Sequence, residues 1–241
     1  MFDTANICER GGRDVNQDAI LSINQDNFYC WALADGLGGM GGGELASAAA
    51  IEAIEAAFRA APAISPNALV DCLTQANRQV QLSQTQTPAF ASMRTTAVLL
   101  LSNGAAAHWA HCGDSRLYHF RDGVIAAQTL DHSVPQALVA AGRIDASAIR
   151  GHPDRNRILK SLGGAEAPEL TLSESGLQSG DAFLLASDGF WELVTEREME
   201  AELSKAATAQ AWLAGMIARL ATRLLETPGA DNYSAIAILR R

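Results

Sequence analysis

Residues 28–43 have the sequence FYCWALADGLGGMGGG, in which an apolar run ends at Asp35-Gly36 and glycines follow. The run at residues 28–34 is short, apolar and partly aromatic, which predicts a buried strand that leads into a turn. Residues 43–61 then carry apolar side chains at helical spacing, which predicts a helix after the turn. A buried strand, a carboxylate at its end and a helix are therefore expected in this part of the chain.

The segments outside this stretch also mix strands with helices. Asn103-Gly104 and Asp122-Gly123 are turn signals that join strand-like runs into two hairpins. Antiparallel hairpins with paired helices before and after them predict an α+β fold in which helices cover the sheet layers. The further predicted strands lie at residues 95–102, 106–112, 116–121, 124–130, 182–186 and 233–239, and the further helices at 65–83, after 195 and around 212–224.

The whole chain has 241 residues, of which 48% are hydrophobic and 19% charged, and its formal net charge is −9. This composition is typical of a globular protein, and the acidic balance argues against partners such as nucleic acid or an anionic membrane, because both require a basic face. The sequence shows no secretory leader and no run of about 20 apolar residues. Its four widely spaced cysteines form no Cys-x-x-Cys pair, which favours free thiols. We therefore expect a cytoplasmic protein with one domain over residues 1–241.

Aspartates recur where strand-like runs meet turns. Each one alone is explained by turn chemistry, because Asp-Gly and Asp-Asn are common turn dipeptides. Together their carboxylates should converge at one end of the sheets, where they would repel one another unless cations neutralised them. Oxygen ligands of this kind suit Mg²⁺ or Mn²⁺, and the sequence has no competing cluster of histidines or cysteines. The five residues of this set are Asp18, Asp35, Asp114, Asp188 and Asp231.

Five short motifs follow in order: RDVNQD at residues 13–18, ADGLGG at 34–39, GDSR at 113–116, ASDG at 186–189 and DN at 231–232. In this order they resemble the metal-dependent protein serine/threonine phosphatases, the PPM or type 2C family, over nearly the whole chain. The resemblance implies two packed antiparallel β-sheets flanked by helix pairs, an α-β-β-α sandwich. It also implies hydrolysis of phosphoserine and phosphothreonine by a metal-bridged hydroxide, in a site with two or three Mn²⁺ or Mg²⁺ ions and without a phosphoenzyme intermediate.

The resemblance assigns metal-binding roles to individual residues. Asp35 would bridge two metal ions, and Gly36 would offer its backbone carbonyl to the same site. Asp188 and Asp231 would bind one of these ions directly. Asp18 would hold the other ion, largely through bound water.

Further roles follow from the same motifs. Asp114 would belong to a third, weaker metal position found in bacterial members, and Arg13 would bind the substrate phosphate through its bidentate guanidinium. Gln17 stands where many members have glutamate, and Leu37 stands where eukaryotic members often carry a histidine that is proposed as general acid. The second departure leaves the donor of the leaving-group proton open, and we expect water on a metal to supply it. The residues expected to act in catalysis are Arg13, Asp18 and Asp35.

Residues 131–168 lose regular periodicity and gain Gly, Pro, Arg and His, which predicts a partly helical surface excursion. Helix-like apolar pieces lie at 134–141 and 158–162. The family places a flap beside the metal cleft here, at approximately residues 131–163. The flap is locally basic, which suits the charge of a phosphorylated substrate, although ordinary solvated surface explains this equally well. Its arginines are Arg143, Arg150, Arg155 and Arg157.

Two other functions stay open from the sequence: a non-catalytic regulatory module with the phosphatase fold, and a phosphohydrolase for small phosphoesters. The presence of Asp35, Asp188 and Asp231 weighs against the first, because inactive relatives usually lose a ligand. Cys72 and Arg78 have the Cys-x5-Arg spacing of cysteine-dependent phosphatases. They lie within a predicted helix that lacks phosphate-cradling glycines, so this match is read as accidental.

The expected partners follow from the expected reaction. A phosphorylated protein would be the substrate, and a cognate bacterial serine/threonine kinase would be the enzyme that this phosphatase opposes. The short form of the chain also resembles phosphatases that oppose kinases of bacterial type VI secretion.

Overall fold

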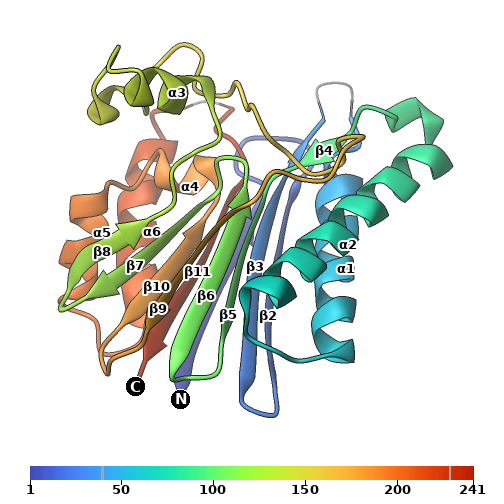
Figure 1. The fold of residues 1–241 in the computed structure, drawn as a ribbon. Helices are drawn as coiled ribbons and strands as arrows, with labels where there is room; N and C mark the ends of the chain where they lie inside the picture. Colours follow the sequence, from blue (N-terminus) through green and yellow to red (C-terminus); the bar gives the residue numbers. More distant parts are fainter. Residues whose placement is uncertain (39–40, 228) are drawn as a thin grey trace.

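The computed structural model describes residues 1–38, 41–227 and 229–241, and it consists of two antiparallel β-sheets packed face to face between layers of helices (Figure 1). One sheet has the strand order β1 (Phe2–Glu9), β11 (Tyr233–Arg240), β10 (Ala182–Ala186), β7 (Arg116–Arg121) and β8 (Val124–Gln128). The other has the order β2 (Asp18–Gln25), β3 (Phe28–Leu37), β5 (Ala97–Ser102), β6 (Ala106–Cys112) and β9 (Thr171–Gly176), and β4 (Arg94–Thr95) pairs with β3. The predicted α+β sandwich is confirmed.

The helices form the two outer layers. One layer, packed on the sheet that contains β3, consists of α1 (Gly43–Ala60) and α2 (Pro66–Gln86). The layer on the other sheet consists of α4 (Asp188–Trp191), α5 (Glu196–Leu203) and α6 (Ala209–Leu224). The short elements η1 (Pro88–Phe90), α3 (Val134–Ala140) and η2 (Ala146–Ala148) lie outside the sheets. No helix in the described part of the chain is both long and apolar enough to cross a membrane.

Strand β3 shows why its sequence is continuously apolar. Cys30 and Ala32 belong to the hydrophobic cluster that the sheet forms with α1 and α2. Trp31 and Leu33 belong to a second cluster, between the two sheets. Because both faces of β3 are buried, the strand carries an unbroken apolar run rather than an alternating pattern.

Helix ends agree with the capping signals in the sequence. The side chain of Ser65 accepts a hydrogen bond from the Ala68 N–H at 3.0 Å and begins α2. The carboxylate of Glu198 accepts the Thr195 N–H at 2.9 Å at the start of α5. These side chains satisfy backbone donors that have no partner within the first helical turn.

The sequence predicts a turn at Asp35-Gly36, and this local prediction is wrong. Strand β3 continues to Leu37, because Gly36 and Leu37 pair with the short strand β4. Because β4 comes from a distant part of the chain, its pairing with Gly36 and Leu37 outweighs the local turn signal. Further along the glycine-rich segment, Gly39 and Met40 lie outside the described residues.

The second local error concerns residues 158–162, which are predicted to be helical. The chain is not helical there, and Ile158 and Leu162 instead form single antiparallel bridges with Ser133 and Thr95. The helix predicted at residues 134–141 is confirmed as α3. Pairing with distant backbone thus decides the conformation of one apolar piece of the flap, while local capping decides the other.

Candidate active site

The five predicted aspartates lie at one end of the sandwich. Strand β2 begins at Asp18, which is the register partner of Asp35 on β3. Asp114 lies in the connection between β6 and β7, Asp188 follows β10, and Asp231 precedes β11. These strand ends point away from the two chain termini, which lie together at the opposite end (Figure 1).

A cavity of about 510 Å³ opens at this end, and we call it the acidic cavity. Four of the five aspartates line it, together with the predicted Arg13 and Gly36. Asp18 does not line the cavity but lies buried, with one carboxylate oxygen accepting a hydrogen bond from Ser187 Oγ at 2.9 Å. The lining residues are Arg13, Gln17, Asp35, Gly36, Leu37, Gly38, Ser92, Arg94, Asp114, Asn156, Ile158, Asp188, Asp231 and Asn232.

Three carboxyls of the acidic cavity, and the buried Asp18 behind it, have raised pKa values. Burial raises the pKa of Asp35 well above its usual value, and the charges of Asp18 and Asp188 raise it further. Burial likewise raises the pKa of Asp114. It also raises the pKa of Asp18 to about 6 and that of Asp188 to about 7, and the charge of Asp231 adds to both shifts. Each ionised carboxylate disfavours the ionisation of the next, so the group would be stabilised by additional positive charge, such as bound cations.

The donor atoms of the acidic cavity fit hydrated, hard cations. Within the described residues, no three Asp, Glu, His or Cys side chains are arranged to hold a metal ion by themselves. Mg²⁺ keeps several waters and binds proteins through few carboxylates, so protein ligands need not enclose it. The second oxygen of Asp18 is buried without a hydrogen-bond partner in the described structure, as expected of a carboxylate that lacks its counterion. The metal-binding roles of the individual residues stay predictions. These residues are Asp18, Asp35, Gly36, Asp114, Asp188 and Asp231.

Hydroxyl groups hold the backbone of Asp35 in place. The Asp35 N–H donates to Thr96 Oγ1 at 3.0 Å, and the Thr96 N–H donates to the Asp35 carbonyl at 2.8 Å. Thr96 Oγ1 also shares a hydrogen bond of 2.7 Å with Ser115 Oγ. Ser115 directly follows Asp114, so this chain of contacts ties the backbones of two cavity aspartates together.

Arg13 is carried by a loop that Asn232 anchors. The Asn232 side chain accepts the Gln17 N–H at 2.9 Å and donates to the carbonyls of Arg10 and Val15 at 2.8 and 3.0 Å. Sequence reasoning treated Asn232 only as part of a motif, and its three bonds show that it shapes the loop. The Arg13 Nη2 atom then pairs with the Asp231 carboxylate at 2.8 Å, which places the guanidinium at the cavity.

Four cavity residues were missed by sequence reasoning: Ser92, Arg94, Asn156 and Ile158. Arg94 lies on β4 and forms no ion pair with any described residue, so it adds a positive charge that is not tied to a single carboxylate. The signal that could have found it is an arginine at the start of a buried apolar strand. Asn156 and Ile158 belong to the segment predicted as a flap, so this segment contributes two side chains to the lining of the acidic cavity.

The flap arginines do not form the free basic patch that the sequence suggested. Arg150 pairs with Glu196 at 2.7 Å, and Arg155 pairs with Glu192 at 3.0 Å. Both carboxylates lie between β10 and the end of α5, so these pairs attach the flap to the neighbouring helices. Arg157 is more exposed, and its ion pair within the described structure is with Asp154 of the flap itself, at 3.3 Å.

The cysteine-based alternative is excluded by the surroundings of Cys72. This residue is buried within α2, and burial raises the pKa of its thiol to about 11. A nucleophilic cysteine requires a lowered pKa and access to the substrate. The interpretation of the Cys72 and Arg78 spacing as accidental therefore holds.

The sequence and the fold resemble bacterial serine/threonine phosphatases. The family model described as "Protein phosphatase 2C" matches residues 9–226. The serine/threonine protein phosphatase PstP of Mycobacterium tuberculosis is 32% identical over 223 residues, which make up 90% of this chain and 42% of PstP. The chain thus spans less than half the length of that relative.

Solved structures extend the likeness to the whole fold. A serine/threonine phosphatase from S. agalactiae has a TM-score of 0.87 at 25% identity, covering 100% of both chains. The catalytic domain of PstP, in complex with two manganese ions, has a TM-score of 0.80 at 29% identity, covering 98% of this chain and 97% of its own. PppA, described as a key regulatory component of T6SS in Pseudomonas aeruginosa, has a TM-score of 0.81 at 29% identity, covering 100% and 98%.

Proposed function

Since this chain belongs to the protein phosphatase 2C family, we propose that it is a metal-dependent phosphatase that removes phosphate from phosphoserine and phosphothreonine in proteins. The observation that carries the proposal is the acidic cavity, in which four carboxylates and two arginines share one lining. The carboxylates can hold metal ions, and the guanidinium groups can bind phosphate. Hydrolysis of a phosphate ester at a metal site uses both kinds of group. We further propose that residues 1–241 act as one catalytic domain.

Two or three Mn²⁺ or Mg²⁺ ions are the proposed cofactors, in line with the manganese bound by the PstP domain. Asp35, Asp188 and Asp231 would hold them together with the Gly36 carbonyl, Asp18 through water, and Asp114 at an additional position. When bound, such ions lower the pKa of water and neutralise negative charge on phosphate.

The arginines would bind and orient the phosphate group. The Arg13 side chain is 52% exposed, and among the described residues its guanidinium contacts Asp231 through Nη2, so its other N–H groups can reach a phosphate oxygen. A guanidinium presents a planar fork of donors that matches two phosphate oxygens at once. Arg94 adds a second cation to the same cavity without a carboxylate partner in the described residues.

The proton on the departing serine or threonine oxygen would come from water. Within the described residues, the lining of the acidic cavity contains no His, Cys, Tyr or Lys that could act as the acid. Leu37 occupies the lining next to Gly36 and offers an apolar side chain only. Because the lining aspartates are assigned to the metal ions, the chain contributes binding, orientation and charge at this step rather than a side-chain proton donor.

The proposed partners are a phosphorylated protein and the serine/threonine kinase that phosphorylates it, and the proposed compartment is the cytoplasm. The likeness to PppA, whose description names T6SS, supports a kinase associated with type VI secretion as one candidate. This part of the proposal depends on the relatives and not on the geometry of the site.

The proposed function is tested with metal-saturated protein and two substrate panels. We expect phosphoserine and phosphothreonine peptides to be hydrolysed with a kcat/KM at least about tenfold higher than sugar phosphates, because a protein substrate can also contact the flap. Phosphate release with Mn²⁺ measures both panels. A preference for sugar phosphates would indicate the small-phosphoester alternative, and no hydrolysis in either panel would indicate a non-catalytic module.

Flap residue Arg157 is expected to contribute to the binding of protein substrates. It lies between Asn156 and Ile158, which line the acidic cavity, and its side chain is 68% exposed. The Arg157→Ala variant should raise KM for a phosphoprotein about threefold to tenfold, whereas hydrolysis of an aryl phosphate should change little, because surface charge acts mainly on the encounter with a charged partner.

Arg143→Ala is the matched control, because Arg143 is exposed on the same flap but does not line the cavity. Arg155 is less suitable, since its loss would also unpair Glu192. If the Arg143 and Arg157 variants raise KM equally, the effect comes from the general surface charge of the flap and not from a contact between Arg157 and the substrate.

A further inference from the structure

We propose that Trp191 is a positioning residue that fixes the orientation of Asp114 in the acidic cavity. The Trp191 indole N–H donates to the Asp114 backbone carbonyl at 3.0 Å, and both groups are buried. No other donor to this carbonyl is present in the described part of the structure. The inference rests on the proposed function, in which Asp114 contributes to an additional metal position.

Trp191 links two of the proposed metal ligands. It is the last residue of α4, and Asp188 is the first residue of the same short helix. The backbone of α4 thus sets the distance from Trp191 to Asp188, and the indole N–H sets the distance from Trp191 to Asp114. One side chain therefore determines how two carboxylates that belong to different connections lie relative to each other.

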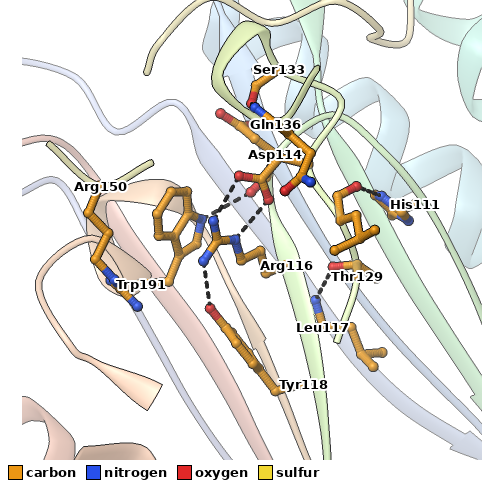
Figure 2. Close-up of polar contacts among 12 residues, drawn as sticks. His111, Asp114, Arg116, Leu117, Tyr118, Thr129, Ser133, Gln136, Arg150 and Trp191 are labelled. Atoms are coloured by element: carbon orange, nitrogen blue, oxygen red, sulfur yellow. Dashed lines mark hydrogen bonds and ion pairs between the residues drawn. The ribbon is translucent and has the colours of Figure 1, made fainter. Parts of the chain in front are cut away.

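The indole itself is held by a buried guanidinium (Figure 2). The Arg116 Cζ atom lies 3.5 Å from the centroid of the Trp191 ring, within the range of a cation–π contact. Arg116 is in turn fixed by two hydrogen bonds of 2.8 Å to the Asp131 carboxylate. The Arg150 Cζ atom of the flap lies 5.4 Å from the same ring. Rotation of the indole would break these contacts, so its N–H is kept aimed at Asp114.

The neighbours of Asp114 are anchored independently of Trp191. The Gly113 N–H donates to His132 Nδ1 at 3.2 Å, and the His132 N–H donates to the Gly113 carbonyl at 2.9 Å. On the other side, Ser115 Oγ contacts Thr96 Oγ1 at 2.7 Å. The peptide group between Asp114 and Ser115 is therefore the part of this turn that these contacts leave free to rotate. The Trp191 indole N–H fixes it by donating to the Asp114 carbonyl.

The loss of this bond should weaken metal binding without unfolding the protein. Without the indole N–H, the Asp114 carbonyl would be a buried acceptor with no donor, which is unfavourable. A rotation of this peptide that relieved the cost would also move the Asp114 side chain within the cavity. Outer residues that orient metal ligands typically change metal affinity by 10- to 100-fold when they are replaced. We expect the effect of Trp191 to lie near the lower end, on the order of tenfold, because it holds one ligand.

The test compares Trp191→Phe with Trp212→Phe by calorimetric titration of the metal-free protein with Mn²⁺. Trp212 is a matched control, since its indole N–H donates to a buried backbone carbonyl, that of Met199, at 2.9 Å. Trp212 packs under the sheet and does not line the acidic cavity. Trp191→Phe should weaken the weakest Mn²⁺ binding event on the order of tenfold, and Trp212→Phe should leave it unchanged.

Unchanged Mn²⁺ binding in Trp191→Phe, or equal weakening in both variants, would overturn the inference. Native protein that binds no Mn²⁺ would instead overturn the proposed function from which it follows. The kinetic expectation is a lower kcat at limiting Mn²⁺ that recovers at saturating Mn²⁺, with KM for an aryl phosphate little changed.

A second measurement covers the case in which Trp191→Phe does not fold. Native protein labelled with ¹⁵N-tryptophan gives four indole resonances, and those of Trp31, Trp109 and Trp212 are assigned by their Phe variants. The remaining resonance, from Trp191, should shift on saturation with Mg²⁺, whereas the Trp212 resonance should stay in place. A Trp191 resonance that does not respond to Mg²⁺ would contradict a positioning role.

Discussion

Removal of divalent cations with EDTA is expected to abolish phosphoester hydrolysis by this protein, whereas alkylation with iodoacetamide is expected to leave it intact. The reaction proposed for the acidic cavity depends on cations bound by carboxylates, and no cysteine lines it within the described residues. Burial raises the pKa of Cys72 to about 11 and that of Cys112 to about 12, and it raises the pKa of Cys30 as well. Thiols of this kind are neutral at pH 7 and react slowly with alkylating agents.

The measurement is phosphate release from an aryl phosphate after each treatment, with hydrolysis by untreated protein as reference. Activity should return when excess Mn²⁺ is added to the chelated protein, which distinguishes metal removal from denaturation. Turnover that survives EDTA but is destroyed by iodoacetamide would replace the metal-dependent proposal with a cysteine-based one.

The second large effect is expected from Asp188→Asn, which should lower turnover by more than about a hundredfold. The substitution removes a charged ligand but keeps the shape of the side chain. It should also raise the free energy of unfolding of the metal-free protein by about 1–3 kcal/mol near pH 8, because it removes one of several carboxylates that repel one another. A loss of activity together with a gain in stability separates a ligand role from a structural one.

The pH dependence of stability provides an independent check. The pKa of Asp188 is about 7 in the folded protein and 3.8 in the reference state, so the folded protein binds more protons between these values. Its contribution to stability is therefore complete below about pH 4 and is lost as the pH rises through 7. Metal-free Asp188→Asn should lose less stability than the native protein between pH 5 and pH 8, as measured by urea unfolding.

Asp71→Asn is the matched control, since it makes the same chemical change at an exposed position of α2. Both its turnover and its stability should equal those of the native protein. A fully active Asp188→Asn variant that still responds to Mn²⁺ would show that Asp188 is not a ligand.

Much of the fold could be predicted because its signals are local. The strands around Asn103-Gly104 and Asp122-Gly123 begin and end close to the predicted positions, since these dipeptides favour the turns that join antiparallel strands. Helix α2 begins at the predicted Ser65 cap for a similarly local reason. The error at Asp35-Gly36 arose where pairing with β4, some sixty residues away in the sequence, overrides the turn signal.

The residues of the site also differ in whether local sequence or tertiary pairing reveals them. The positions of the five aspartates and of Arg13 were recognised from motifs, and the structure places all but Asp18 on the lining of one cavity. Arg94 could not be found in this way, because its relevance comes from the pairing of β4 with β3. The pairing of Arg155 with Glu192 was equally hidden, so the flap had been expected to be more basic than it is.

The sequence by itself determined the class of fold and the residues available for chemistry, because apolar periodicity, turn dipeptides and caps act through a few neighbouring residues. Only the tertiary structure decided how those residues meet. It buries Asp18 behind the cavity, compensates the charges of Arg150 and Arg155, and directs the Trp191 indole to Asp114. The physical reason is that electrostatic and hydrogen-bond energies depend on distances across space, and the pairs that matter here join segments of the chain far apart in sequence.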